Sequence, residues 1–296
     1  MVEEKLNQTN INWFPGHMAK TLKEIEANIK IADLVLYCLD ARAPFSCLNP
    51  EIDKIISSKS IVYVLNKSDL ADESKTAQAK IKLEEKAPVI LTNANAVSNK
   101  ATIIKAIKKS LENKLKKRAE KNINSALKVL VIGVPNVGKS TIINLLAGRK
   151  KAVTGDKAGV TKAISWVKIA DGIILMDSPG TLWPNLEDQD VANNLAFIGS
   201  ISDNAIDLSE LGFNLVKHLI KIEPQKLIDR YNLNYSASEI GKVEPIEVYD
   251  QICLNRKFIL KKNEIDYERA GRAIIDDFRS GRIGRITLEW NQIMTY

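Results

Sequence analysis

One segment of the chain combines glycines, a lysine and hydroxyl side chains at a spacing suited to binding phosphate. Residues 133–140 read GVPNVGKS, a complete match to GxxxxGK followed by Ser or Thr. An apolar run, KVLVI, precedes the segment and a helical pattern, KSTIINLLA, continues it, which is the context that confirms this motif. In such a loop the backbone N–H groups and the helix N-terminus surround phosphate oxygens. The sequence therefore predicts a nucleoside triphosphate site, with phosphate contacts from Pro135, Asn136, Val137, Gly138, Lys139, Ser140 and Thr141.

A second segment predicts which base the site accepts. Asn66–Asp69 reads NKSD directly after the apolar run IVYVL. A carboxylate at Asp69 accepts hydrogen bonds from N1–H and the 2-amino group of guanine, a donor pair that adenine lacks. Asn66 is expected at the base edge and the stem of Lys67 over the ring. A polar turn after a strand is the alternative interpretation. The loop expected behind the base follows the run PVIL and comprises Thr92, Asn93, Ala94 and Asn95.

A third segment predicts the metal and the switch. Asp177–Gly180 reads DSPG after the run IILM, where Asp177 would support Mg²⁺ through water and the Gly180 N–H would sense the γ-phosphate. Ser140 would ligate the same Mg²⁺. Thr161 is the expected switch ligand to the ion, with Thr154 as the other candidate. Lys139 would stabilise charge that develops on the phosphates during hydrolysis.

The water-positioning glutamine of many GTPases has no counterpart here. Thr181, Leu182 and Trp183 follow DSPG, and none of them can replace a glutamine. His17 is the candidate for that task, because a neutral imidazole can orient or deprotonate water near pH 7. The residues alone equally support a structural role for His17. His218, in NLVKHLIKI, is expected on a helix surface.

The order of these segments is unusual. A typical GTPase runs from the phosphate loop through the switch threonine and DxxG to NKxD and the base-backing loop. Here NKSD and TNAN precede GVPNVGKS and DSPG, which indicates a circular permutation. A permutation moves the chain ends and leaves strand neighbours unchanged, so one sheet can still hold all the parts.

The elements that must position these segments alternate. Short apolar runs within 31–39, 61–65, 88–91, 128–132 and 173–176, and a further strand over 161–168, are separated by helical patterns over 19–30, 74–85, 100–117 and 139–147. This pattern predicts an α/β fold with a mostly parallel sheet and helices on both faces. Beyond residue 190 the pattern is helical, over 191–198, 208–222, 224–231, 245–260 and 266–280, with a weak strand over 285–288. We therefore expect a permuted G domain over 1–190 and an all-α domain over 191–296.

Composition limits the class of protein. The 296 residues are 45% hydrophobic and carry a net charge of +7, typical of a globular protein with a polyanionic partner. Three cysteines without a CxxC pair and only two histidines do not support a zinc site. The N-terminus lacks the apolar core of a signal peptide. We expect a cytoplasmic protein, with neither a membrane nor DNA as a partner.

Positive charge gathers in two places. Residues 100–128 contain ten basic and two acidic side chains, and a helix over 266–280 carries an arginine stripe opposite an apolar face. Such a stripe would bind RNA phosphates with a steep salt dependence, and a solvated helix face is the alternative. The stripe comprises Arg269, Arg272 and Arg279.

Taken together, the motifs resemble those of the circularly permuted GTPases, and among them the ribosome biogenesis GTPases. Beyond NKSD, GVPNVGKST and DSPGTLWP, the resemblance includes WFPGHM at 13–18, DARAP at 40–44 with Asn49–Pro50 after it, TGDKAGVT at 154–161 and the C-terminal IDYERAGRAIIDDFRSGRIGRI at 265–286. It extends over nearly the whole chain. The loop TNAN departs from the family pattern, which begins with serine.

This resemblance implies a GTPase that acts in late assembly of the large ribosomal subunit. It implies binding of ribosomal RNA in the GTP form, release after hydrolysis to GDP, a catalytic His17, and potassium stimulation through Asn136. A GTP-gated RNA-binding scaffold with negligible hydrolysis is the alternative, favoured by the missing glutamine. An ATP-using P-loop enzyme such as a small kinase is a third possibility, and Asp69 argues against it.

Overall fold

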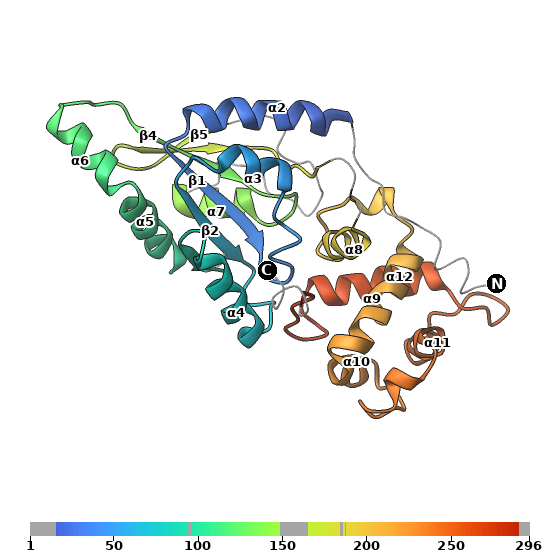
Figure 1. The fold of residues 1–296 in the computed structure, drawn as a ribbon. Helices are drawn as coiled ribbons and strands as arrows, with labels where there is room; N and C mark the ends of the chain where they lie inside the picture. Colours follow the sequence, from blue (N-terminus) through green and yellow to red (C-terminus); the bar gives the residue numbers. More distant parts are fainter. Residues whose placement is uncertain are drawn as a thin grey trace.

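A six-stranded sheet forms the centre of the larger part of the molecule (Figure 1). The computed structural model describes residues 16–93, 96, 98–148, 165–183, 186 and 188–289, with the side chains of 16–19 and 165 left aside. The strands lie in the order β3-β2-β1-β4-β6-β5, and only β5 runs antiparallel to its neighbour. Their bounds are β1 Leu34–Asp40, β2 Ile61–Asn66, β3 Val89–Leu91, β4 Leu127–Ile132, β5 Ser165–Ala170 and β6 Ile173–Asp177.

The strand order explains how a permuted sequence assembles one site. Strand β4, which leads into the phosphate loop, lies between β1 and β6, although three strands precede it in the chain. Because β1, β2, β4 and β6 are parallel, their carboxyl ends meet at one edge of the sheet. Asp40, Asn66, the phosphate loop and Asp177 therefore converge there. The predicted α/β fold is confirmed.

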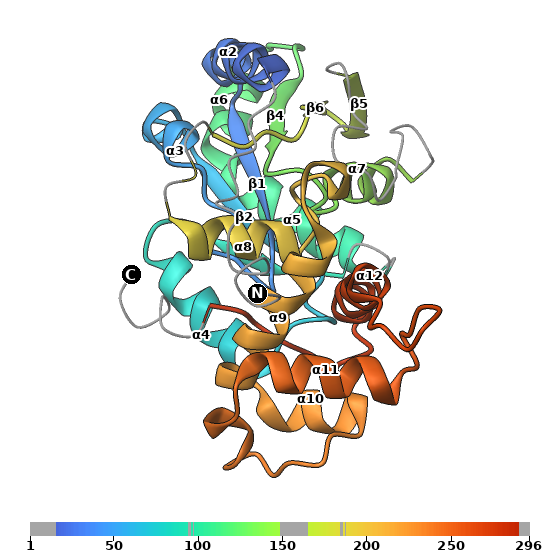
Figure 2. The same ribbon diagram turned by 90° about the vertical axis from the view of Figure 1, so that its right-hand side faces the viewer.

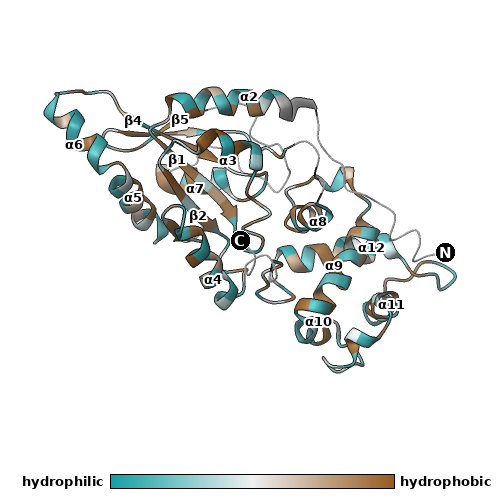
Figure 3. Ribbon diagram, in the orientation of Figure 1, coloured by the Kyte–Doolittle hydropathy of each residue, from teal (hydrophilic) through white to brown (hydrophobic). Residues whose placement is uncertain are grey.

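Helices cover both faces of this sheet. Helices α5 and α7 contact each other on one side, and α2 and α3 contact each other on the other, as Figure 2 shows on either side of β1. Their interior faces are apolar, and Figure 3 shows the hydrophobic residues concentrated in the strands between them. The bounds of the helices in this part are α2 Gly16–Ile31, α3 Pro50–Ile56, α4 Glu73–Glu84, α5 Asn99–Ser110, α6 Glu112–Glu120 and α7 Lys139–Ala147.

Two of these helices differ from the sequence-based expectation. The pattern over 100–117 predicts one helix, but the chain breaks at Leu111 (φ −102°, ψ 2°), whose buried side chain is anchored in the core between α5 and α6. Helix α3 was not predicted. Its start is encoded by Asn49, whose side chain accepts hydrogen bonds from the Glu51 and Ile52 N–H groups, and by Pro50 at the first helical position.

The C-terminal part is helical and packs around α9. Helix α9 contacts α8, α10, α11 and α12, and most of its side chains are buried. The bounds are α8 Gln189–Phe197, η1 Asp203–Ala205, α9 Leu208–Ile222, α10 Pro224–Tyr231, η2 Ile240–Lys242, α11 Pro245–Asn255 and α12 Tyr267–Arg279. Prolines begin α10 and α11, as the sequence predicts, but α11 ends at Asn255 rather than at residue 260.

After α12 the chain returns to the part of the molecule that contains the sheet and helices α2–α7, which we call the sheet domain. The weak strand predicted over 285–288 is not formed; these residues instead make separate hydrogen bonds to residues 42 and 70. Ile286 and Leu288 are buried in the process. Within the described part of the chain, no helix has the length and apolar character needed to cross a bilayer.

Candidate nucleotide-binding site

The phosphate loop connects β4 to α7. It directly contacts the NKSD segment, residues 66–69, which we call the guanine motif. Gly138 has a left-handed φ of +91°, and a Cβ at this position would lie 2.3 Å from Asn66 Nδ2. A larger residue would therefore push the two motifs apart. Asn66 Nδ2 donates a 2.8 Å hydrogen bond to the Val137 carbonyl, and Lys67 Nζ donates a 2.7 Å bond to the Asn136 carbonyl. The two predicted binding segments, about 70 residues apart in the chain, form one structure.

Lys139 is buried at the start of α7. Its Nζ donates to the carbonyl oxygens of Gly133 and Val134, at 2.9 and 2.8 Å. Burial lowers the pKa of Lys139 to about 8, although Cys38 and Asp177 act in the opposite direction. The lysine is thus a cation held in a desolvated position at which a phosphate oxygen would favour its charged form.

Asp177 lies at the carboxyl end of β6 beside this lysine. Its carboxylate is buried, and burial raises the pKa of Asp177 to about 6 against the lowering effect of Lys139. Its Oδ1 has no hydrogen-bond partner among the residues that the structure describes. Gly180 follows closely: a Cβ there would lie 2.7 Å from Pro135 Cα and 2.8 Å from Lys139 Nζ. DSPG therefore packs onto the phosphate loop.

Asp40 and Arg42 support the guanine motif, a role that the sequence analysis did not assign. Arg42 donates to both carboxylate oxygens of Asp40, and Lys67 Nζ lies 3.1 Å from the same carboxylate. Burial alone would raise the pKa of Asp40, but the charges of Arg42 and Lys67 outweigh it and hold the pKa well below its usual range. The only signal in the sequence was the segment DARAP at the end of β1.

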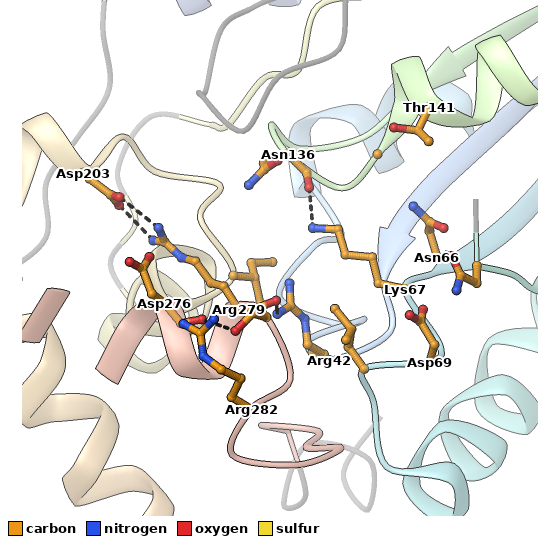
Figure 4. Close-up of a pocket in the computed structure, with 15 residues that line it drawn as sticks. Arg42, Asn66, Lys67, Asp69, Asn136, Thr141, Asp203, Asp276, Arg279 and Arg282 are labelled. Carbon is orange, nitrogen blue, oxygen red and sulfur yellow. Dashed lines mark hydrogen bonds and ion pairs between the residues drawn. The ribbon is translucent and has the colours of Figure 1, made fainter. Parts of the chain in front are cut away.

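A pocket of about 640 Å³ opens between the guanine motif and the helical part (Figure 4). Asp69 is exposed on its wall, beside Asn66 and Lys67. Side chains of the helical part form the opposite wall, so both parts of the molecule enclose it. Its lining comprises Arg42, Asn66, Lys67, Asp69, Leu70, Asn93, Asn136, Gly138, Thr141, Ile198, Asp203, Asp276, Arg279, Ser280 and Arg282.

The turn after α8 touches the phosphate loop. Ser200 Oγ donates a 2.7 Å hydrogen bond to the Pro135 carbonyl. A Cβ at Gly199 would lie 2.9 Å from Asn136 Nδ2 and 3.3 Å from the Arg279 guanidinium carbon. The helical part therefore contacts the phosphate loop at the asparagine expected to serve a monovalent ion.

Arg279 differs from the expected member of an RNA-binding stripe. Its guanidinium donates to both oxygens of Asp203 at 2.9 Å and to the carbonyls of Phe197 and Ala196, and its side chain is only 19% exposed. The arginine closes α12 onto α8, because position 279 lies at the end of the helix where the apolar face turns inward. Arg269 and Arg272 remain exposed.

The structure describes some of the other predicted residues and not the rest. Thr92 is buried and its Oγ1 has no partner among the described residues, and Asn93 lines the pocket. Ala94, Asn95 and Thr161 lie outside the described residues, and so does the side chain of His17, whose backbone belongs to α2. His218 is not a surface residue: it is half-buried, and its Nε2 lies 3.0 Å from the Leu288 carbonyl oxygen.

Comparison with known protein families adds to this geometry. Residues 128–241 match the family model described as 50S ribosome-binding GTPase. The chain is 38% identical over 281 residues to ribosome biogenesis GTPase A of Bacillus cereus, covering 94% of this chain and 93% of that protein. It is 31% identical to mitochondrial ribosome-associated GTPase 1 of Mus musculus, over 94% of this chain and 89% of that protein.

Two solved structures resemble the whole arrangement. GDP-bound YlqF superposes with a TM-score of 0.63 at 25% identity, covering 91% of this chain and 99% of that one. GNP-bound YlqF from Thermotoga maritima gives a TM-score of 0.61 at 25% identity, over 91% and 97% of the two chains. The similarity therefore spans the sheet, the pocket and the helical part together.

Proposed function

Because the chain belongs to the ribosome biogenesis GTPase A family, we propose that it binds the maturing large ribosomal subunit in its GTP form and leaves after hydrolysis. It hydrolyses GTP to GDP and phosphate and acts in ribosome assembly. The finer steps below are our proposals for this chain.

The observation that carries the proposal is the direct contact between the phosphate loop and the guanine motif. The bonds from Asn66 to Val137 and from Lys67 to Asn136 fix the distance between the two ends of a bound nucleotide. Lys139 is held where the β- and γ-phosphates would lie, and Asp69 is exposed on the pocket wall where guanine would present its two donors.

The residues present fit a magnesium ion. Asp177 is buried with one oxygen unpartnered among the described residues, beside the loop that ends in Ser140. Hard oxygen ligands of this kind suit Mg²⁺, which keeps several waters and takes its other ligands from phosphate. Ser140 and Thr161 would ligate it and Asp177 would act through water. When bound, the ion neutralises charge on the β- and γ-phosphates. A potassium ion beside Asn136 is part of the same proposal.

The residue that positions the attacking water is His17 in this proposal. It is the second residue of α2. Thr181, directly after the DSPG segment, is buried and its hydroxyl donates a 2.9 Å hydrogen bond to the Leu182 carbonyl, and Leu182 is apolar, so neither supplies the amide of the usual glutamine. A neutral imidazole would accept a proton from water as it attacks the γ-phosphate.

Hydrolysis would reach the ribosome-binding part through α8. DSPG leads into α8, and the turn after α8 contacts Pro135 and Asn136 of the phosphate loop. A change at the γ-phosphate thus acts on both ends of one short helix. Arg269 and Arg272, exposed on α12, are the proposed contacts to ribosomal RNA, whereas Arg279 serves inside the molecule.

Single-turnover hydrolysis with purified large subunits tests the proposal. We expect subunits to stimulate GTP cleavage and His17→Ala to reduce the stimulated rate about 100-fold, the usual scale for a general base. Lys30→Ala is the control, because Lys30 is exposed at the other end of the same helix and its loss should leave the rate within about twofold. If subunits gave no stimulation and His17→Ala no loss, the alternative of a GTP-gated RNA-binding scaffold would replace this account.

A further inference from the structure

The segment after α12 lies against the turn that carries the guanine-reading aspartate. Arg285 Nε donates a 2.8 Å hydrogen bond to the Ala71 carbonyl, and its Nη2 donates a 3.2 Å bond to the Ser68 carbonyl. Ser68 is the residue directly before Asp69. One guanidinium therefore bridges both sides of the turn that presents Asp69 to the pocket.

Backbone contacts extend this clamp along the same turn. The Ile286 N–H donates a 3.0 Å bond to the Leu70 carbonyl, and Thr287 Oγ1 accepts a 3.1 Å bond from the Asp72 N–H. Ile286 and Thr287 are fully buried. Residues 68–72 thus make four hydrogen bonds to residues 285–287, a segment more than 200 positions away in the chain.

The other side of this segment is attached to the helical part. Lys226 Nζ, on α10, donates a 2.7 Å bond to the Arg285 carbonyl and pairs with Glu223 at 2.9 Å. His218 of α9 bonds the Leu288 carbonyl. The segment is therefore held between α9 and α10 on one side and the guanine-reading turn on the other.

From this geometry we infer that Arg285 is a positioning residue for Asp69, and that residues 285–287 couple guanine-nucleotide affinity to the placement of the helical part. The inference rests on the proposed guanine site and adds its regulation. Coupling of this kind is reciprocal. Nucleotide that orders the turn stabilises the docked helical part, and a partner that draws the helical part away loosens the turn and speeds release of GDP.

A purely structural role for Arg285 would give a different pattern from a positioning role. Loss of folding would weaken every ligand of the site. Loss of positioning would weaken guanine recognition and leave the phosphate loop unchanged, because among the described residues of the sheet domain the Arg285 side chain bonds only to residues 68, 71 and 73. Inorganic tripolyphosphate occupies the phosphate loop alone and therefore separates the two roles.

The experiment measures GDP, ADP and tripolyphosphate binding to the full chain. For Arg285→Ala we expect the Kd for GDP to rise about tenfold through a faster off-rate, and the Kd for tripolyphosphate to stay within about twofold. Thr287→Val, which keeps the buried shape but removes the acceptor for the Asp72 N–H, should raise the Kd for GDP about threefold. Arg256→Ala is the control, because Arg256 is exposed at the end of α11 and bonds the Arg230 carbonyl, away from residues 68–72.

Three outcomes would overturn the inference. The first is an unchanged off-rate for GDP in both the Arg285 and Thr287 variants. The second is an equal loss of GDP and tripolyphosphate affinity, which would assign these residues to folding alone. The third is a wild-type chain that binds tripolyphosphate but does not prefer GDP to ADP; that result would remove the guanine site itself, and so is distinguishable from failure of the coupling.

Discussion

Asp69 carries base selectivity at the residue scale. It is exposed on the pocket wall, within a turn whose Ser68 and Ala71 carbonyls accept hydrogen bonds from Arg285. A carboxylate selects guanine because it accepts both N1–H and the 2-amino group, and any base without those donors leaves the charge unpaired. Selectivity therefore depends on one carboxylate and on the rigidity of its turn.

Replacing this carboxylate by an amide should change the preferred base. In Asp69→Asn we expect GDP affinity to fall at least about 100-fold and xanthosine diphosphate to become the better ligand, because xanthine offers an acceptor where guanine has the 2-amino group. Fluorescence competition with the two diphosphates measures this. Asp171→Asn, at an exposed position between β5 and β6, is the control. An unchanged preference in Asp69→Asn would mean that another residue reads the base.

Single residues were predictable where their function is encoded in a contiguous motif. Lys139, Asn66 and Asp177 follow strands within short patterns, and the structure brings them to one edge of the sheet. The roles of Arg42 and Arg285 could not be assigned, since Arg42 supports a segment of another strand through Asp40 and the partners of Arg285 lie more than 200 positions away. For Arg279 the helical periodicity predicted a contact to RNA, but its acidic partner, Asp203, lies in η1, whose position depends on the tertiary fold.

The crossing of α9 and α12 sets the architecture at the element scale. The two helices approach at Gly212 and Gly271, where a Cβ on Gly212 would lie 2.4 Å from Gly271 Cα. A Cβ on Gly271 would lie 1.9 Å from the Leu208 carbonyl oxygen. This contact leaves no room for a side chain, so the helix carrying Arg269 and Arg272 is fixed to the centre of the helical part by backbone contact.

Gly271→Ala should therefore force the two helices apart. We expect the free energy of unfolding to fall by about 3 kcal/mol, at the upper end of the cost of overpacking. Denaturant unfolding measures it. Gly241→Ala is the matched control: a Cβ there meets nothing within 4 Å, so its effect should stay within about 0.5 kcal/mol. Equal stability of the two variants would show that α9 and α12 do not cross in this way.

Elements with strong periodicity were predictable, and their ends were less so. The pattern located α9 and α10 with the observed bounds, because their apolar faces are continuous and a proline marks the start of α10. The segment over 285–288 resembles a strand because Ile286 and Leu288 alternate with polar residues. It buries both side chains but pairs with no strand in the part of the chain that the structure describes, and sequence alternation does not encode that difference.

At the scale of the whole molecule, Glu289 joins the end of the described chain to the sheet domain. It is buried and accepts hydrogen bonds from the backbone N–H groups of Phe45, at 2.7 Å, and Ser46. Burial raises the pKa of Glu289 from 4.5 to about 7, with a further increase from Asp40, against the lowering effect of those bonds. The docked state therefore favours the protonated acid.

This carboxyl predicts a pH dependence of stability. Because its folded pKa lies above its unfolded value, its contribution is fully present below pH 4.5 and is lost as the pH rises through about 7. The difference corresponds to about 3 kcal/mol. Between pH 5 and pH 8 we expect the free energy of unfolding of the wild type to fall by about 2–3 kcal/mol more than that of Glu289→Gln, which keeps a neutral acceptor. Parallel pH profiles for the two proteins would contradict this assignment.

The central claim concerns the whole molecule: the nucleotide determines whether the helical part holds the large subunit. Co-sedimentation with purified large subunits tests it most directly, in GDP and in a non-hydrolysable GTP analogue. The account predicts that the protein sediments with the subunits in the analogue and remains mostly in the supernatant in GDP. Equal sedimentation in the two nucleotides, or none in either, would contradict it.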